Sequence, residues 1–328
     1  MKLKCASHSH TPKIGETDEQ HKLRRAYHLF DRQKITQEQV LEAQQETIRE
    51  SVEEQQKAGI DIVTDGQIRW NDPLSYLMKG LEGVEIGGLL RFFDTNFYFR
   101  QPKIVGPILR KSSLLKDEVL FLKKIAKGET KAVLTGPYTL ALLSRIETSA
   151  YTSIEDVAQV LTEILAEEVK ELAEARVSHI QIEEPGYGLV QPHWGWAERS
   201  METLAKNKGK AKLWLTTYFG ECIPFYSKLQ TLSADVLGLD VTYSSKLLAH
   251  IQKEGTDKEL ALGLLDGRNT KLEDPKEVAK ALHSLDQVLK NGVCYVTTSC
   301  GLEYLPRDKA FKKLRLLEDI KREYQRGA

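Results

Sequence analysis

Two histidines near the amino terminus could bind one metal ion together. His8 and His10 follow a short apolar run, Leu3–Cys5, which is typical of a first β-strand. On an extended chain, residues two positions apart face the same side, so both imidazoles could reach a single ion. Histidine is a common zinc ligand. The alternative interpretation is a polar loop that carries two solvated histidines.

Further side chains able to bind a metal or move a proton stand at the ends of later apolar runs. Cys300 ends the last of these runs and Asp65 ends the second. If the first and last runs are neighbouring strands, the Cys300 thiolate and a carboxylate could join the two imidazoles in a four-ligand zinc shell. Cys300 could equally be a small buried side chain beside Gly301.

A pair of glutamates and a pair of tryptophans are candidates for binding a substrate. Glu183 and Glu184 precede Pro185, and neighbouring strand residues face opposite sides, so we expect one of them to point inward. An inward glutamate could bind an ammonium group or accept a proton, although a structural ion pair is an equal alternative. Trp194 and Trp196 could clamp a flat ligand, but packing is the favoured interpretation.

The elements that must position these residues are eight apolar runs that alternate with helical segments. The charged segment 36–57 and the segment 154–175 have helical spacing of apolar residues. Such alternation predicts a parallel sheet, and eight repeats predict a closed (β/α)₈ TIM barrel with its active site at the carboxyl ends of the strands. These ends are Asp65, Glu183, Glu184, Tyr218, Asp240, Asp266 and Cys300.

One segment interrupts the alternation. Residues 84–105 contain two adjacent glycines and an aromatic cluster, which predicts a hairpin-like insertion after the second strand, either over the barrel mouth or as an oligomer contact. Nothing else divides the chain, so we expect a single domain over residues 1–328.

The composition excludes several other classes of protein. The 328 residues include 47 basic and 47 acidic side chains, so no basic excess favours nucleic-acid binding. No apolar run is long enough to cross a membrane, and the amino terminus lacks the apolar core of a signal peptide. Four sparse cysteines are typical of a reducing cytoplasm. Dinucleotide and P-loop motifs are absent.

An ordered set of motifs resembles the cobalamin-independent methionine synthase family over almost the whole chain. The motifs are DGQIRWND at 65–72, LTGPY at 134–138, IQIEEP at 180–185, LLDGRN at 264–269 and TSCGL at 298–302. The resemblance implies a methyltransferase that uses a zinc-bound thiolate, homocysteine and a methyl donor, either a folate or a corrinoid. It implies zinc ligation by Cys300 and Asp240, with His8 or His10 supplying the missing nitrogen.

The sequence departs from this family at the metal-binding positions. Thr217 and Phe219 stand where the zinc-binding barrel has a histidine and a cysteine, and Gln67 replaces a carboxylate. The segment 215–220 is more similar to the family's N-terminal barrel, which lacks zinc. We predict catalytic roles for Glu183, Asp65 and Tyr218. We predict substrate contacts from Gln67, Trp70, Glu184, Trp194 and Asp266.

Three hypotheses follow from these motifs. The first is a methyltransferase acting on a small thiol or amino acid such as homocysteine, with zinc. The second is a noncatalytic or folate-binding partner barrel that works beside a second, zinc-bearing barrel chain. A methyl-carrier protein is a further possible partner, as the source of the methyl group. The third is a diverged metalloenzyme that uses His8 and His10 for other chemistry.

Overall fold

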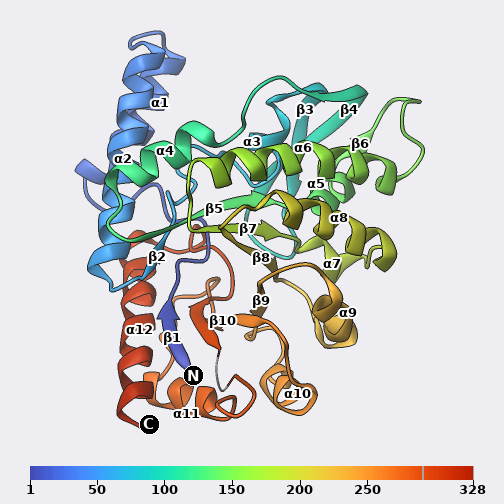
Figure 1. The fold of residues 1–328 in the computed structure, drawn as a ribbon. Helices are drawn as coiled ribbons and strands as arrows, with labels where there is room; N and C mark the ends of the chain where they lie inside the picture. Colours follow the sequence, from blue (N-terminus) through green and yellow to red (C-terminus); the bar gives the residue numbers. More distant parts are fainter. Residues whose placement is uncertain (290–291, 328) are drawn as a thin grey trace.

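Parallel strands close into a barrel in this computed structural model, which describes residues 1–289 and 292–327 (Figure 1). The barrel strands are β1 (Lys2–Cys5), β2 (Ile62–Val63), β5 (Glu129–Thr135), β7 (His179–Glu183), β8 (Lys212–Thr217), β9 (Val236–Asp240), β10 (Glu259–Leu265) and β11 (Val293–Thr298). Their order around the sheet is β1, β11, β10, β9, β8, β7, β5 and β2. A parallel bridge between Ala6 and Ile62 joins the two ends of this sheet. The predicted TIM barrel is therefore confirmed.

Helices on the outside of the barrel bury the outward faces of the strands. The α-helices are α1 (Lys22–Asp31), α2 (Gln37–Lys57), α3 (Ser75–Met78), α4 (Lys116–Ile125), α5 (Pro137–Leu142), α6 (Ile154–Glu174), α7 (Gly186–Leu189), α8 (Trp194–Asn207), α9 (Tyr226–Thr231), α10 (Leu247–Glu254), α11 (Pro275–His283) and α12 (Arg307–Arg326). Two 3₁₀ turns are η1 (Glu19–His21) and η2 (Ile223–Phe225). No described helix has the length and apolar character needed to span a membrane.

The two helices predicted from apolar spacing form with little change in their bounds. Thr36 caps α2, since its hydroxyl accepts the backbone N–H of Gln39 and the Gln39 side chain accepts the N–H of Thr36. Ser153 and Asp156 make the same reciprocal pair at the start of α6. Such capping boxes satisfy N–H groups that have no partner within the helix, and this is why both helices begin at these residues.

The insertion after β2 is a hairpin, as predicted, but it is longer than residues 84–105. Strand β3 (Leu81–Arg91) pairs antiparallel with β4 (Tyr98–Arg110), and the short β6 (Arg145–Ile146) completes a separate three-stranded sheet. Asp72 anchors the hairpin because its carboxylate accepts the backbone N–H groups of Leu74, Ser75 and Arg100. The insertion therefore has a fixed attachment beside β2.

Charged and polar side chains fill the amino-terminal end of the barrel interior. Lys4 donates to Glu129 at 2.7 Å, and Glu129 lies 3.2 Å from a ring nitrogen of His179. On the other side, Lys212 donates to Glu259 at 2.6 Å. A small apolar cluster, separate from the main core, comprises Ala6, Ile62, Trp214, Val236, Ala261 and Tyr295. The barrel is therefore a packed interior rather than a channel.

The predicted domain boundaries, 1–328, include residues 290, 291 and 328, which lie outside the described residues. The single-domain organisation stays a prediction.

Candidate functional site

Glu183 lies at the centre of a buried hydrogen-bond network above the middle of the barrel. Tyr218, which follows β8, donates its hydroxyl to Glu183 Oε2 at 2.8 Å. Gln181, two residues earlier on β7, donates its amide to Glu183 Oε1 at 2.8 Å. His8 Nδ1 lies 3.5 Å from the same oxygen. Burial raises the pKa of Glu183, while the bonds from Tyr218 and Gln181 oppose the shift. Three elements therefore meet at one inward carboxylate, as predicted for one of the two glutamates.

Glu184 points away from this network and caps a helix. Its carboxylate accepts the backbone N–H groups of Tyr138 and Thr139 at 2.9 and 2.8 Å, together with the Thr139 hydroxyl. Burial raises the pKa of Glu184 to about 7. Because both oxygens hold the amino terminus of α5, the geometry gives no support to the predicted substrate contact.

Asp65 and Gln67 form a closed turn at the end of β2. Asp65 Oδ1 accepts the backbone N–H of Gln67 at 3.0 Å and its side-chain amide at 2.7 Å. Gly66 and Gln67 have φ values of 69° and 47°, and the second is unusual for a residue with a Cβ atom. Burial raises the pKa of Asp65 to about 6. The Gln67 side-chain oxygen is buried without a hydrogen-bond partner, so Gln67 retains an acceptor for a ligand.

His10 and Trp70 lie on the β2 side of the barrel mouth. Their rings meet edge to face with centroids 5.4 Å apart, and Trp70 stacks on Tyr76. Lys13, which the sequence analysis did not single out, donates to the Trp70 carbonyl. Burial lowers the pKa of Lys13 to about 8, against the attraction of Glu303. Trp70 is therefore a buried packing residue, with 1% of its surface exposed.

The two histidines of the sequence pair contact different sides of the mouth. Strand β1 ends at Cys5, so His8 and His10 lie beyond the extended segment, and the same-side rule for strands does not apply to them. The His8 ring packs against Tyr218, whereas the His10 ring packs against Trp70. Burial lowers the pKa of His8 well below its usual range and that of His10 to about 3, so both are neutral at pH 7. Both Nε2 atoms are buried without a partner.

The other two predicted metal ligands are already occupied or inaccessible. Asp240 Oδ1 accepts the N–H groups of Thr242 and Tyr243, and the Thr242 hydroxyl. The buried Cys300 thiol donates to the Gly301 carbonyl at 3.3 Å, and burial raises its pKa well above the usual range. Within residues 1–289 and 292–327, no group of three or more His, Cys, Asp and Glu side chains is arranged to hold a metal ion. The predicted four-ligand set of His8, His10, Asp240 and Cys300 is thus not assembled, and these residues do not fit zinc.

A cavity of about 440 Å³ lies between the barrel mouth and the tip of the β3–β4 hairpin. Its walls are Arg91, Asp94, Thr95, Asn96, Phe97, Arg268, Glu303 and Tyr304. Phe97 packs on Tyr304, and Phe92 and Phe93 pack on Phe219. The aromatic insertion was expected either to cover the barrel mouth or to form an oligomer contact. In the structure its tip lies over the mouth.

Glu303 is the most unusual residue of this cavity. Its Oε2 atom is buried and has no hydrogen-bond partner. Burial raises the pKa of Glu303 to about 8, and the nearby Glu183 carboxylate adds to the shift. Arg268, on the loop after β10, also lines the cavity and donates to Asp266 at 3.0 Å. The only sequence signal for Glu303 was its place three residues after Cys300, in the loop after the last strand.

The two remaining predicted substrate contacts have structural partners. Trp194 packs between Tyr187 and Phe225, and its indole N–H donates to Gln191 at 3.3 Å. This agrees with the packing interpretation. Asp266 accepts hydrogen bonds from both the side chain and the backbone N–H of Arg268, so it orients the arginine.

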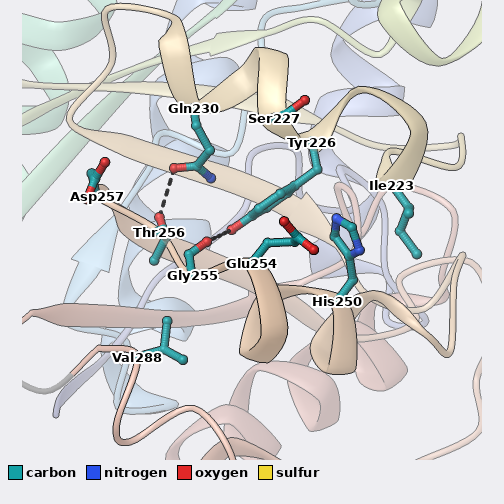
Figure 2. Close-up of a pocket in the computed structure, with 10 residues that line it drawn as sticks. All are labelled: Ile223, Tyr226, Ser227, Gln230, His250, Glu254, Gly255, Thr256, Asp257 and Val288. Carbon is teal, nitrogen blue, oxygen red and sulfur yellow. Dashed lines mark hydrogen bonds between the residues drawn. The ribbon is translucent and has the colours of Figure 1, made fainter.

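A second cavity, of about 670 Å³, lies on the outside of the barrel between α9 and α10 (Figure 2). Tyr226 donates to the Gly255 carbonyl at 2.8 Å, and Thr256 donates to Gln230 at 3.1 Å. His250 packs edge to face on Tyr226. None of the residues expected to do chemistry lines this cavity, so the mouth remains the candidate active site.

Comparisons with known proteins identify relatives over most of the chain. The model for "Cobalamin-independent synthase, N-terminal domain" matches residues 76–290. A methionine synthase of Sulfurisphaera tokodaii is 31% identical over 306 residues, which are 93% of this chain and 89% of that protein. A methionine synthase of Sulfolobus acidocaldarius is 30% identical over 305 residues, covering 93% and 88%.

Solved structures share the fold. A B12-independent methionine synthase from Shewanella sp. W3-18-1, in complex with selenomethionine, superposes with a TM-score of 0.80 at 22% identity, over 100% of this chain and 99% of that chain. A methyltransferase from Methanosarcina mazei gives a TM-score of 0.65 at 12% identity, over 99% and 94%. At these identities the likeness concerns the fold alone.

Proposed function

The chain belongs to the cobalamin-independent methionine synthase family, and from this premise we propose that it transfers a methyl group to the thiol of a small amino acid such as homocysteine. Curated relatives that are similar over 93% of the chain are named methionine synthases. This similarity over nearly full length favours the methyltransferase over a noncatalytic partner barrel or a diverged metalloenzyme based on His8 and His10.

The observation that carries the proposed substrate class is the pairing of Glu303 with Arg268 in the mouth cavity. An amino acid carries an ammonium and a carboxylate group. The unpartnered Glu303 oxygen can accept from the ammonium, and the Arg268 guanidinium can donate to the carboxylate. Repulsion from the Glu183 carboxylate contributes to the raised pKa of Glu303, so a cationic group bound there would favour the ionised form of Glu303.

The chain's own residues would orient the substrate and exclude water. Phe92, Phe93 and Phe97 cover the cavity, and an enclosed site strengthens each ion pair within it. His8 Nδ1 lies 2.9 Å from the Ser9 hydroxyl and 3.5 Å from Glu183 Oε1. In the tautomer with its proton on Nδ1, the buried Nε2 carries a lone pair that can accept a hydrogen bond from the thiol. In transfer from a folate donor, the N5–methyl bond breaks and a sulfur–methyl bond forms, while the thiol loses a proton and N5 of the departing tetrahydrofolate gains one. Because the four predicted ligands do not fit zinc, we derive no step through a metal.

A product assay tests the proposal directly. The purified chain would be given homocysteine with a methyl donor, either 5-methyltetrahydrofolate or methylcobalamin, and methionine would be measured by mass spectrometry. We expect methionine from the wild type and a loss of about tenfold or more in kcat/KM for Glu303→Gln, because a charged hydrogen bond to the ammonium is removed. The exposed Glu163→Gln on α6 is the matched control. No methionine with either donor would contradict the proposed function.

A further inference from the structure

A lysine is buried inside the barrel, directly below the Glu183 network. Lys131 on β5 has 1% of its surface exposed. Its ammonium lies 4.3 Å from the centre of the Trp214 ring and donates to Gln181 Oε1 at 2.6 Å. Burial lowers the pKa of Lys131 to about 7, against the attraction of Glu183. An apolar side chain of this length would fill the same space without desolvating a charge, so the lysine is not explained by packing.

The bond from Lys131 determines which way the Gln181 amide faces. Lysine donates N–H groups in both of its protonation states, so the amide oxygen is held toward Nζ. The amide nitrogen is then turned the other way and donates to Glu183 Oε1 at 2.8 Å and to the His8 carbonyl at 3.0 Å. A flipped amide would place its oxygen against the Glu183 carboxylate, with repulsion in place of a hydrogen bond.

Gln181 in turn helps to fix the Glu183 carboxylate. One carboxylate oxygen accepts from Gln181 and the other accepts from Tyr218 at 2.8 Å. These two donors come from β7 and from the segment after β8, so together they restrict both the side-chain rotation and the plane of the carboxylate. Hydrogen bonds from a second layer of residues commonly hold such groups in the geometry that binding requires.

We propose that Lys131 and Gln181 are positioning residues, which act through Glu183 to orient the part of the site that receives the substrate ammonium. This inference rests on the proposed function, because it assigns Glu183 to binding of an amino-acid thiol. The walls of the mouth cavity include none of Lys131, Gln181 and Glu183. Glu183 acts on the cavity through its electrostatic effect on Glu303, so Lys131 and Gln181 act one step further away, through the Glu183 carboxylate.

Two readouts test this role, one with ligands and one without. The first is the ratio of the dissociation constants of homocysteine and 4-mercaptobutanoate, which lacks the amino group, measured by calorimetry. For Lys131→Met we expect about tenfold weaker binding of homocysteine and less than about twofold change for 4-mercaptobutanoate. Lys4→Met removes a lysine that binds Glu129 at the amino-terminal end of the barrel, so it is the matched control and should leave the ratio unchanged.

The second readout is the crystal structure of ligand-free Lys131→Met. We expect the Gln181 amide to turn and the Glu183 carboxylate to leave at least one of its two hydrogen bonds. The proposal would be overturned if Glu183 kept both hydrogen bonds in this variant. It would also be overturned if the affinities for homocysteine and 4-mercaptobutanoate fell equally. If Lys131→Met does not fold, Gln181→Leu also removes the link between Lys131 and Glu183. The same two measurements then apply to it, the ratio of the two dissociation constants and the presence of the Glu183–Tyr218 hydrogen bond in the crystal structure.

The two proposals fail separately. Wild-type protein that binds neither ligand would contradict the proposed function, while the crystal structure would still decide whether Lys131 positions Glu183. Wild-type protein that binds homocysteine selectively, with unchanged selectivity in both variants, would overturn the positioning role alone.

Discussion

Glu303, for which we propose a binding role, also lowers the stability of the fold. Its carboxyl group is held among Glu183, Cys300 and Tyr304, and it lacks a partner for one buried oxygen. Groups that are arranged for a ligand are commonly less than optimal in the free protein. The folded chain therefore favours the protonated form of Glu303 until a cationic group arrives.

This arrangement predicts a pH-dependent effect of Glu303→Gln on stability. The folded-state pKa of about 8 lies above the ordinary value of 4.5, so the carboxyl favours folding below pH 4.5, and this contribution is lost as the pH rises through 8. Relative to wild type, Glu303→Gln should gain about 4 kcal/mol at pH 8 and less than about 0.5 kcal/mol at pH 4.5. Urea unfolding at both pH values measures this difference, and an equal gain at both would contradict it.

At the scale of elements, the short helix α5 depends on a side chain from another strand. Its amino terminus has no capping residue of its own, and the buried Glu184 after β7 takes that place. A carboxylate at this end also interacts favourably with the helix dipole. The contact joins the segments after β5 and β7.

Replacing Glu184 should therefore destabilise the fold rather than remove one ligand contact. In Glu184→Ala, two buried N–H groups lose their acceptor, and we expect the free energy of unfolding to fall by about 2–4 kcal/mol. Glu163→Ala, at an exposed position of α6, should change it by less than about 0.5 kcal/mol. Chemical denaturation compares the two variants, and similar values would argue against the capping role.

The β3–β4 hairpin gives a second prediction at this scale. Phe97 lines the mouth cavity and packs on Tyr304, whereas the next residue, Tyr98, is 55% exposed. Phe97→Ala should raise KM for the thiol by about fivefold or more through loss of enclosure, with a change in unfolding free energy of about 1 kcal/mol or less. Tyr98→Ala is the control. Equal KM values for both variants would show that the hairpin tip does not contribute to binding.

At the scale of the whole molecule, the geometry predicts that zinc is not a structural component. Because the described residues hold no three-ligand group, treatment with a chelator should leave the thermal unfolding midpoint unchanged within about 1 °C. Metal analysis of the purified chain gives the complementary measurement. Stoichiometric zinc that disappears in both His10→Ala and Cys300→Ser would instead restore the ligand set expected from the sequence.

The sequence was sufficient for the fold because the barrel depends on patterns that repeat along the chain. The apolar runs and the helical spacing at 154–175 predict local structure, and parallel pairing then follows from their alternation. Family motifs located Glu183 and Tyr218, and the rule of two-residue alternation could also have found Gln181. Residue spacing did not show that strand β1 stops at Cys5, and this loop geometry separates the contacts of His8 from those of His10.

For a related reason, the sequence did not indicate a role in the site for Glu303, Arg268 or Lys131. Their importance comes from burial and from the absence or presence of particular partners, which the three-dimensional arrangement alone determines. A lysine at the start of an apolar strand and a glutamate in a loop are common in any globular protein.

The ion pairs that fill the amino-terminal end of the barrel have a consequence for turnover. With Lys4, Glu129, Lys212 and Glu259 occupying that end, no molecule can pass through the barrel axis. On the proposed function, the methyl donor, the thiol and both products would all use the cavity beneath the hairpin tip. A shared entrance would favour ordered binding. The reactant that binds deepest would bind first, and the product formed from it would be released last.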